Sequence, residues 1–174
     1  MKQYQLTLSG QSPLLLHQDN LAWGEKIKRW SKDPANKVDS VAGDDRSPPW
    51  TWLGYLYHDG KRIGMPSDNL MTMLREGGAK VKVANSGKET YKKQTQAGII
   101  VDQQQWDILI NGKAIELAKI SSLAAEKDFY KHLETAQDHG FELLVKRAKV
   151  GQSKHVRVRP LFRAWELKGS LTVV

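Results

Sequence analysis

Apolar residues recur along the chain at spacings typical first of strands and then of helices. Residues 2–9 alternate polar and apolar side chains, which predicts a first strand with Tyr4, Leu6 and Leu8 on one face. The apolar run at residues 14–17 is either a second buried strand or a continuation of the first. The chain is therefore expected to begin with β-structure.

The next segment changes to a helical spacing. Trp23, Ile27 and Trp30 lie at i, i+4 and i+7, which predicts a short amphipathic helix. Residues 31–49 are polar and contain few apolar side chains. Because long loops between core elements are often functional, we interpret residues 19–49 as an exposed insertion of interest.

An aromatic segment then returns the chain to the core. Residues 50–57 have the composition of a strand, and Asp59-Gly60 is a typical turn sequence, so residues 53–65 are predicted to form a hairpin. The six tryptophans of the chain include Trp50 and Trp52, expected on one strand face. Packing in the core or against another subunit is favoured for them over stacking on nucleic-acid bases.

A helix is predicted over residues 66–75. Ser67 or Asp68 can cap its first turn, and Gly77-Gly78 are expected to end it. Residues 79–97 hold five Lys and a single Glu, and we expect them to form a second exposed insertion.

The rest of the chain is predicted to form strands around one helix. In chain order these elements are a strand at 98–101, a hairpin at 106–117 that turns at Asn111-Gly112, a helix at 124–135, and strands at 141–150 and 155–174. Together the elements predict a single α+β domain covering residues 1–174.

Composition limits the classes of protein that fit. A chain of 174 residues with 40% hydrophobic residues can bury one core. The absence of cysteine excludes disulfides, thiolate metal sites and cysteine nucleophiles. No apolar run is long enough to span a membrane, and residues 1–8 lack the apolar block of a secretion signal, so we expect a cytoplasmic protein without a membrane partner.

Charge changes this picture most. The chain holds 27 Lys and Arg against 19 Asp and Glu, a net charge of +8, and its pI is about 9.6. Such a balance favours nucleic acid as the partner, with anionic lipid or an acidic protein as the second choice. A basic protein whose charge serves only solubility is the alternative.

The C-terminal strands carry much of the excess. Residues 141–168 include eight basic and two acidic residues. Alternation places His155, Arg157 and Arg159 on one face, with the valines between them facing the core. Neighbouring cations on a sheet repel each other unless an anion lies across them, and a phosphate backbone is a natural anion for this place. The alternative is a solvated outer face.

The Lys-rich segment 79–97 has the flexible composition that suits phosphate contacts, and Tyr91 can stack on a base. A solvated loop is the alternative here. We find no catalytic motif, and the five histidines have no metal-ligand spacing. Asp44-Asp45 is the one paired carboxylate expected within reach of a substrate, although a solvated turn is the favoured interpretation. We therefore predict no catalytic residue, no metal and no cofactor.

The segment Ile63-Gly64-Met65-Pro66-Ser67-Asp68-Asn69-Leu70-Met71-Thr72-Met73-Leu74-Arg75 resembles a signature of the RAMP superfamily. Members are RRM-like (ferredoxin-like) proteins that form the backbone of CRISPR effector complexes. The layout also resembles an uncharacterised phage and prophage family, with its early Leu14-Leu15-Leu16-His17 run and its late Arg159-Pro160-Leu161-Phe162-Arg163-Ala164-Trp165 segment.

The resemblance implies an RRM-like antiparallel sheet with helices on one face and long insertions. It also implies assembly of copies along a guide RNA, with backbone contacts at Ser67, Asn69 and Arg75. Asp68 replaces the small residue usual after the Pro-small pair, which weakens the phosphate contact implied there. Some members cut RNA with an Asp in an inserted loop, which makes Asp44 and Asp45 worth testing.

The sequence thus predicts a non-catalytic subunit that holds single-stranded RNA or DNA, with RNA favoured, and assembles with copies of itself. A phage structural protein that assembles without nucleic acid is one alternative, and a metal-dependent nuclease is another. The predicted contact residues are Ser67, Asn69, Arg75, Lys80, Lys82, Lys88, Tyr91, Lys92, Lys93, Lys146, Arg147, Lys149, Lys154, His155, Arg157, Arg159 and Arg163.

Overall fold

The computed structural model describes residues 1–174 except the side chain of Val150. It contains 35% helix and 33% strand, and its sheets are antiparallel. The predicted α+β class is therefore confirmed.

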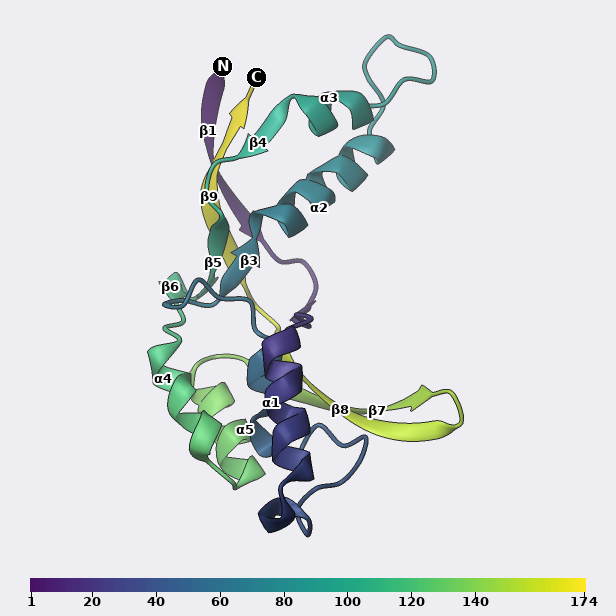
Figure 1. Cartoon of the computed structure of the whole chain (residues 1–174). Coiled ribbons are helices and arrows are strands. Elements are labelled where there is room, and N and C mark those ends of the chain that lie inside the picture. The colour runs from purple at the N-terminus through teal and green to yellow at the C-terminus, as the bar shows by residue number, and fades with distance from the viewer.

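The larger sheet joins the two ends of the chain. Its strands follow the order β1 (Lys2–Ser9), β9 (Glu166–Val173), β5 (Gln105–Ile110) and β3 (Gly64–Pro66), with β4 (Ile99–Val101) beside β9 and β6 (Lys113–Ala114) beside β5. Strands β1 and β9 pair along their whole length, from Lys2↔Val173 to Ser9↔Glu166. Both termini consequently lie together at one end of the molecule (Figure 1).

An arm of two helices extends from this sheet (Figure 1). Helix α2 (Ser67–Lys80) begins where the sequence predicts, with Pro66 rather than Ser67 or Asp68 at the N-cap. The predicted end is wrong, because α2 continues through both glycines. Gly78 is buried, and a Cβ there would lie 2.5 Å from Thr95 Oγ1 of α3 (Lys92–Ala97). Gly78 thus lets the two helices pack closely.

Residues 79–97 are more ordered than a free insertion. They contain the last turn of α2, an antiparallel bridge between Lys82 and Thr90, and α3. We call residues 67–97 the α2–α3 arm.

The other half of the molecule surrounds a small second sheet. This sheet has the order β2 (Leu14–Leu15), β8 (Ser153–Phe162) and β7 (Glu142–Val150). Around it lie α1 (Leu21–Lys32), the short 3₁₀ turns η1 (Pro34–Asn36), η2 (Pro49–Tyr55) and η3 (Ser122–Ala125), and helices α4 (Ala118–Ser121) and α5 (Phe129–Asp138). The outer part of β7 and β8 projects as a hairpin, which we call the β7–β8 hairpin (Figure 1).

The segment predicted as an aromatic strand is the 3₁₀ helix η2 instead. Proline at its first position lacks an N–H and has the φ angle of a helix start, so it favours this conformation. Trp50 and Trp52 are 7% and 0% exposed, and Trp52 packs on Phe141. The preference for core packing of these tryptophans is therefore confirmed, although no strand face holds them.

Residues 19–49 begin with the predicted helix, α1, which Asn20 caps by accepting the Trp23 backbone N–H at 3.0 Å. The later part is not free in solvent. Asp44 forms a parallel bridge with Val156, and the Asp45 N–H donates to the Val156 carbonyl at 3.0 Å. The segment therefore covers the edge of β8 opposite β7, while β7 has β8 as its one partner among the described strands.

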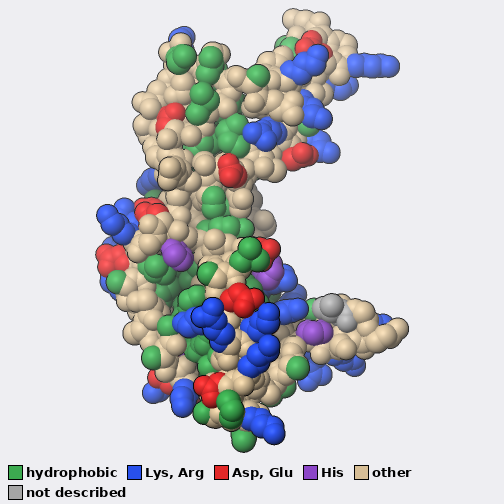
Figure 2. All heavy atoms as spheres, in the orientation of Figure 1, with side chains coloured by type: hydrophobic (Ala, Val, Ile, Leu, Met, Phe, Trp, Pro, Cys, Tyr) green, Lys and Arg blue, Asp and Glu red, His purple; other side chains and the backbone are tan. Residues whose placement is uncertain are grey.

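The molecule is curved, and its concave side opens between the α2–α3 arm and the β7–β8 hairpin (Figure 2). Lys and Arg side chains lie on both projections (Figure 2). Among the described residues no helix is both long and apolar enough to cross a membrane.

Candidate nucleic-acid interface

Strand pairing divides the basic residues of the β7–β8 hairpin between two faces. Lys146 lies opposite Arg157, and Leu144 lies opposite Arg159. Directly paired residues share a face of a sheet. Lys146, His155, Arg157 and Arg159 therefore form one face, which we call the Arg face.

Lys149 pairs with Lys154, and both lie with Arg147 on the opposite face. The predicted grouping of His155, Arg157 and Arg159 is confirmed. Arg147, Lys149 and Lys154 are also predicted contacts, and the register places them on the face opposite to His155, Arg157 and Arg159.

Asp45 is the anion that faces Arg157. Its carboxylate accepts from Arg157 Nη1 at 2.9 Å, from the Tyr55 hydroxyl at 3.0 Å and from the Val158 backbone N–H at 3.2 Å. The Asp45 side chain is 6% exposed and that of Arg157 is 33% exposed. The expectation that a substrate reaches Asp45 is therefore wrong, and at Arg157 the chain itself supplies the anion that relieves cation repulsion.

Tyr55 reinforces this arrangement. Burial, and then the nearby Asp45 charge, raise the pKa of the Tyr55 hydroxyl to about 12. The hydroxyl therefore stays protonated at neutral pH and donates to Asp45. The neighbouring Asp44 is held by Arg46 at 2.6 Å, and this hydrogen bond keeps the pKa of Asp44 below its ordinary value. Within the described residues no three His, Asp or Glu side chains are grouped as metal ligands.

Arg159 differs from Arg157 because no carboxylate holds it. It is half-buried, it makes no ion pair with any described residue, and its Nε is buried without an acceptor. Burying a cation without a partner costs free energy. The guanidinium of Arg159 can therefore pair with an anion from outside the chain.

A cavity of ≈ 300 Å³ lies beside Arg159, between the start of α1, η2 and β8. We call it the Arg159 pocket, and its polar and aromatic lining includes His17, Gln18, Trp23, Tyr55, Arg157 and Arg159. The His17 and Tyr55 rings lie 4.5 Å apart. Sequence reasoning assigned no role to Tyr55, and it noted His17 only as the end of an apolar run.

His17 reports on the electrostatics of this pocket. Burial is the main cause that lowers its pKa, followed by the positive charge of Arg159; Arg157 acts in the same direction, while Asp45 and Asp19 oppose it. The imidazole is consequently neutral at pH 7, and it is free to interact with an incoming anion as a hydrogen-bonding group.

The predicted residues of the α2–α3 arm lie apart from the hairpin (Figure 1). Arg75, Lys80, Lys82, Lys88, Tyr91, Lys92 and Lys93 are exposed, as is Asn69, while Ser67 at the first turn of α2 is half-exposed. None of the basic residues among them forms an ion pair with a described residue. Their charges are thus available to a ligand.

Arg163, the last predicted contact, is engaged within the chain. Its Nε and Nη2 donate to the two carboxylate oxygens of Glu142 at 2.6 and 3.0 Å. This pairing lowers the pKa of Glu142. Arg163 lies outside the Arg159 pocket.

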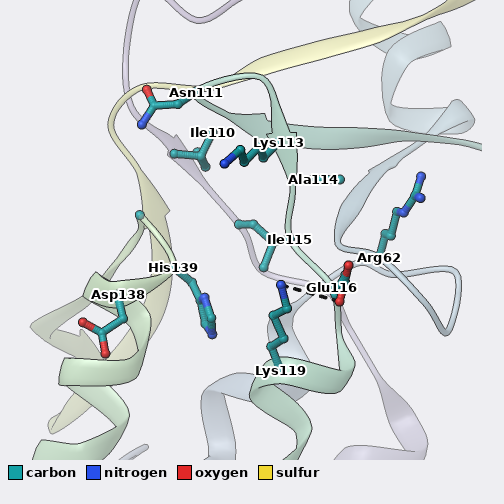
Figure 3. Close-up of a pocket in the computed structure, with 11 residues that line it drawn as sticks. Arg62, Ile110, Asn111, Lys113, Ala114, Ile115, Glu116, Lys119, Asp138 and His139 are labelled. Atoms are coloured by element: carbon teal, nitrogen blue, oxygen red, sulfur yellow. Dashed lines mark ion pairs between the residues drawn. The ribbon is translucent and has the colours of Figure 1, made fainter.

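A larger cavity of ≈ 660 Å³ lies between the end of α5, the β5–β6 hairpin and α4. His139, which directly follows α5, and Lys119 of α4 border the same space (Figure 3). Lys119 pairs with Glu116 at 3.6 Å and Arg62 with Asp107 at 2.9 Å, while Lys113 and Asp138 also border the cavity. In contrast to the Arg159 pocket, none of its described lining side chains has a buried polar atom without a hydrogen-bond partner.

Comparison with protein-family models, with curated proteins and with solved structures finds no match for this chain.

Proposed function

We propose that the chain is a non-catalytic subunit that binds single-stranded nucleic acid, with RNA favoured, along its concave side. The observation that carries this proposal is the set of basic side chains without carboxylate partners on the two projections that flank the concavity (Figure 2). Phosphate contacts by Lys and Arg supply most of the affinity of sequence-independent binding, because each one releases condensed counterions.

The arm and the hairpin have complementary parts in this proposal. Lys80, Lys82 and Arg75 of the arm are exposed, and their long side chains suit contacts along a flexible backbone. The Arg face of the hairpin holds its cations on a rigid antiparallel ladder. Tyr91 on the arm is 39% exposed and offers a stacking surface for a base.

An RRM-like core is part of the proposal. It is supported by the pairing of the first and last strands and by the Pro66-initiated helix α2 that follows an edge strand of the same sheet. The strand order departs from an RRM-like sheet in one respect, because β9 is an interior strand and β1 lies at an edge. The absence of a catalytic role is supported by Asp44 and Asp45, which Arg46 and Arg157 already engage.

Fluorescence anisotropy with labelled single-stranded RNA and DNA of equal length tests the proposal. We expect binding at low salt. The logarithm of the association constant should fall linearly with the logarithm of the salt concentration, with a slope of about −0.7 for each phosphate contact. No binding at low salt would overturn the proposal.

Two variants of strand β7 test whether the nucleic acid contacts the Arg face of the hairpin. Lys146→Gln removes a charge from the Arg face, and we expect it to reduce the salt slope by about 0.7. Lys149→Gln removes the same charge from the opposite face and is expected to have the smaller effect. Equal effects would contradict contact through the Arg face.

Self-assembly without nucleic acid is a second candidate. Tyr4 and Val173 lie on one face of the larger sheet and are 47% and 38% exposed, which favours contact between copies. Size-exclusion chromatography with light scattering, before and after nuclease digestion, separates the candidates. Oligomers that persist after digestion support assembly by protein contacts, whereas oligomers that disappear support assembly along the strand.

A further inference from the structure

We infer that the Arg159 pocket is a discrete site for one phosphate group, and that it fixes the position of the bound strand on the protein. This inference rests on the proposed function, because the phosphate in question belongs to that strand. The pocket is distinct from the exposed cations of the arm, which can contact phosphates in many positions.

The charge around the pocket favours an anion. Asp45 does not line the pocket, but its carboxylate pairs with Arg157 at 2.9 Å, while Arg159 has no described carboxylate at ion-pair distance. Asp19 is exposed at the rim of the pocket and makes no ion pair with Arg159. One half-buried guanidinium therefore remains uncompensated, and an anion that enters the pocket removes the cost of burying it.

Three polar atoms in the pocket lining lack hydrogen-bond partners. Arg159 Nε, Trp23 Nε1 and Gln18 Oε1 are all buried without a hydrogen bond in the described structure. Nearly all buried polar groups in proteins are paired, so three exceptions around one cavity indicate a missing partner. Two of these atoms are donors, which suits a group rich in acceptor oxygens.

The size and the lining of the pocket suit a phosphate group. A volume of ≈ 300 Å³ lies at the lower end of ligand-binding cavities, and it accommodates a phosphate with part of its attached sugar. A guanidinium forms paired hydrogen bonds with phosphate oxygens, and such charge-assisted bonds are stronger than neutral ones. The phenol of Tyr55 and the neutral ring of His17 provide the walls.

Titration with inorganic phosphate tests the pocket without any strand. The readouts are the indole N–H signal of Trp23 and the ring signals of His17 in two-dimensional NMR spectra, with ionic strength held constant by chloride. We expect saturable shifts of both residues. Arg159→Gln should weaken phosphate binding by about tenfold or more, since it removes a charge-assisted hydrogen bond.

Two further variants keep the test interpretable. Arg159→Lys retains the charge but not the paired hydrogen bonds, so an intermediate affinity is expected if the spectra show a folded protein. Arg29→Gln is the matched control, since Arg29 is exposed on α1 and does not line the pocket. Unperturbed Trp23 and His17 signals at saturating phosphate, or equal phosphate binding by Arg159→Gln and wild type, would overturn the inference.

Strands with a 5′-hydroxyl and a 5′-phosphate then identify the source of the phosphate group. Shifts with both strands indicate an internal phosphodiester, and shifts with the phosphorylated strand alone indicate the terminal group. Strand binding that Arg159→Gln leaves intact would overturn the pocket and keep the proposed function. Phosphate binding in the pocket without strand binding would keep the pocket and overturn the proposed function.

Discussion

Asp45 joins three parts of the chain that are distant in sequence. Its carboxylate contacts η2 through Tyr55 and β8 through Arg157 and the Val158 N–H. It also neutralises one of two neighbouring guanidiniums, Arg157, which lines the Arg159 pocket. Its effects on stability and on ligand affinity should therefore have opposite signs.

Asp45→Asn is expected to lower the free energy of unfolding by about 3 kcal/mol, because it leaves a partly buried guanidinium without its carboxylate. The same change should increase affinity for single-stranded RNA, since it removes a negative charge beside Arg159. Urea denaturation and anisotropy titration measure the two effects. Asp39→Asn, at an exposed position, serves as the control. Weaker RNA binding by a folded Asp45→Asn protein would instead favour a direct role of the carboxylate.

His132 is a second buried titratable residue, and its hydrogen bonds define its protonation state. It is 0% exposed, its Nδ1 accepts from Trp52 Nε1 at 3.1 Å, and its Nε2 lies 3.1 Å from the Glu126 carbonyl. These partners require a neutral ring with its hydrogen on Nε2. Burial accordingly lowers the pKa of His132.

This shift predicts the pH dependence of stability. The unfolded chain takes up a proton near pH 6.5, while folded His132 resists protonation until the pH is lower. The stabilisation is therefore complete above pH 6.5 and is lost as the pH falls through the folded pKa, by at most about 1.4 kcal/mol per pH unit. The free energy of unfolding, measured by urea titration at several pH values in this range, should depend less steeply on pH for His132→Gln than for wild type. Identical slopes would mean that His132 does not cause the acid sensitivity.

At the scale of elements, local signals predicted turns better than they predicted ends of helices. Asn111-Gly112 adopts φ values of 51° and 75°, and Gly60 adopts 90°, as their turn positions require. The predicted end of α2 is wrong because Gly78 does not end the helix but allows close packing against Thr95 of α3. This contact between two separate helices is not visible in the local sequence pattern. The 3₁₀ form of η2 was missed because β-propensity describes a half-buried surface, whereas Trp50 and Trp52 are buried together.

The two glycines of α2 provide a matched pair. Gly77→Ala meets no atom within 4 Å and should stabilise the protein by about 0.5–1 kcal/mol, because alanine favours the helix interior. Gly78→Ala should destabilise it, since its Cβ would lie 2.5 Å from Thr95 Oγ1. Denaturation midpoints of both variants test this difference. A stabilising Gly78→Ala would mean that α3 does not pack on α2 in solution.

At the scale of the whole molecule, the arm and the hairpin are separate contact regions on one concave side (Figure 1). A strand long enough to reach both binds the second region as an intramolecular step, at a high effective concentration. Affinity should therefore rise steeply once the strand spans the concavity and change little beyond that length. Anisotropy titrations with a series of strand lengths measure this step. The combined Lys80→Gln and Lys82→Gln variant should reduce the step, and an unchanged step would place the second contact elsewhere.

The candidate site could be predicted in part. The Arg face follows from alternation along one strand, a local property that the sequence shows directly. The Arg159 pocket does not, because His17, Tyr55 and Asp45 meet β8 only after the chain has folded. The ion pair that neutralises Arg157 was invisible for the same reason: its carboxylate lies 112 residues away in sequence.

The free side of β7 has a further consequence. Its backbone N–H and C=O groups on that side face no other described strand, and such an edge can recruit a strand of another molecule into a growing sheet. Lys146, Arg147 and Lys149 lie along it, and charges at these places repel an approaching copy. We therefore expect some of the positive charge of this protein to oppose aggregation, whichever ligand the Arg face binds.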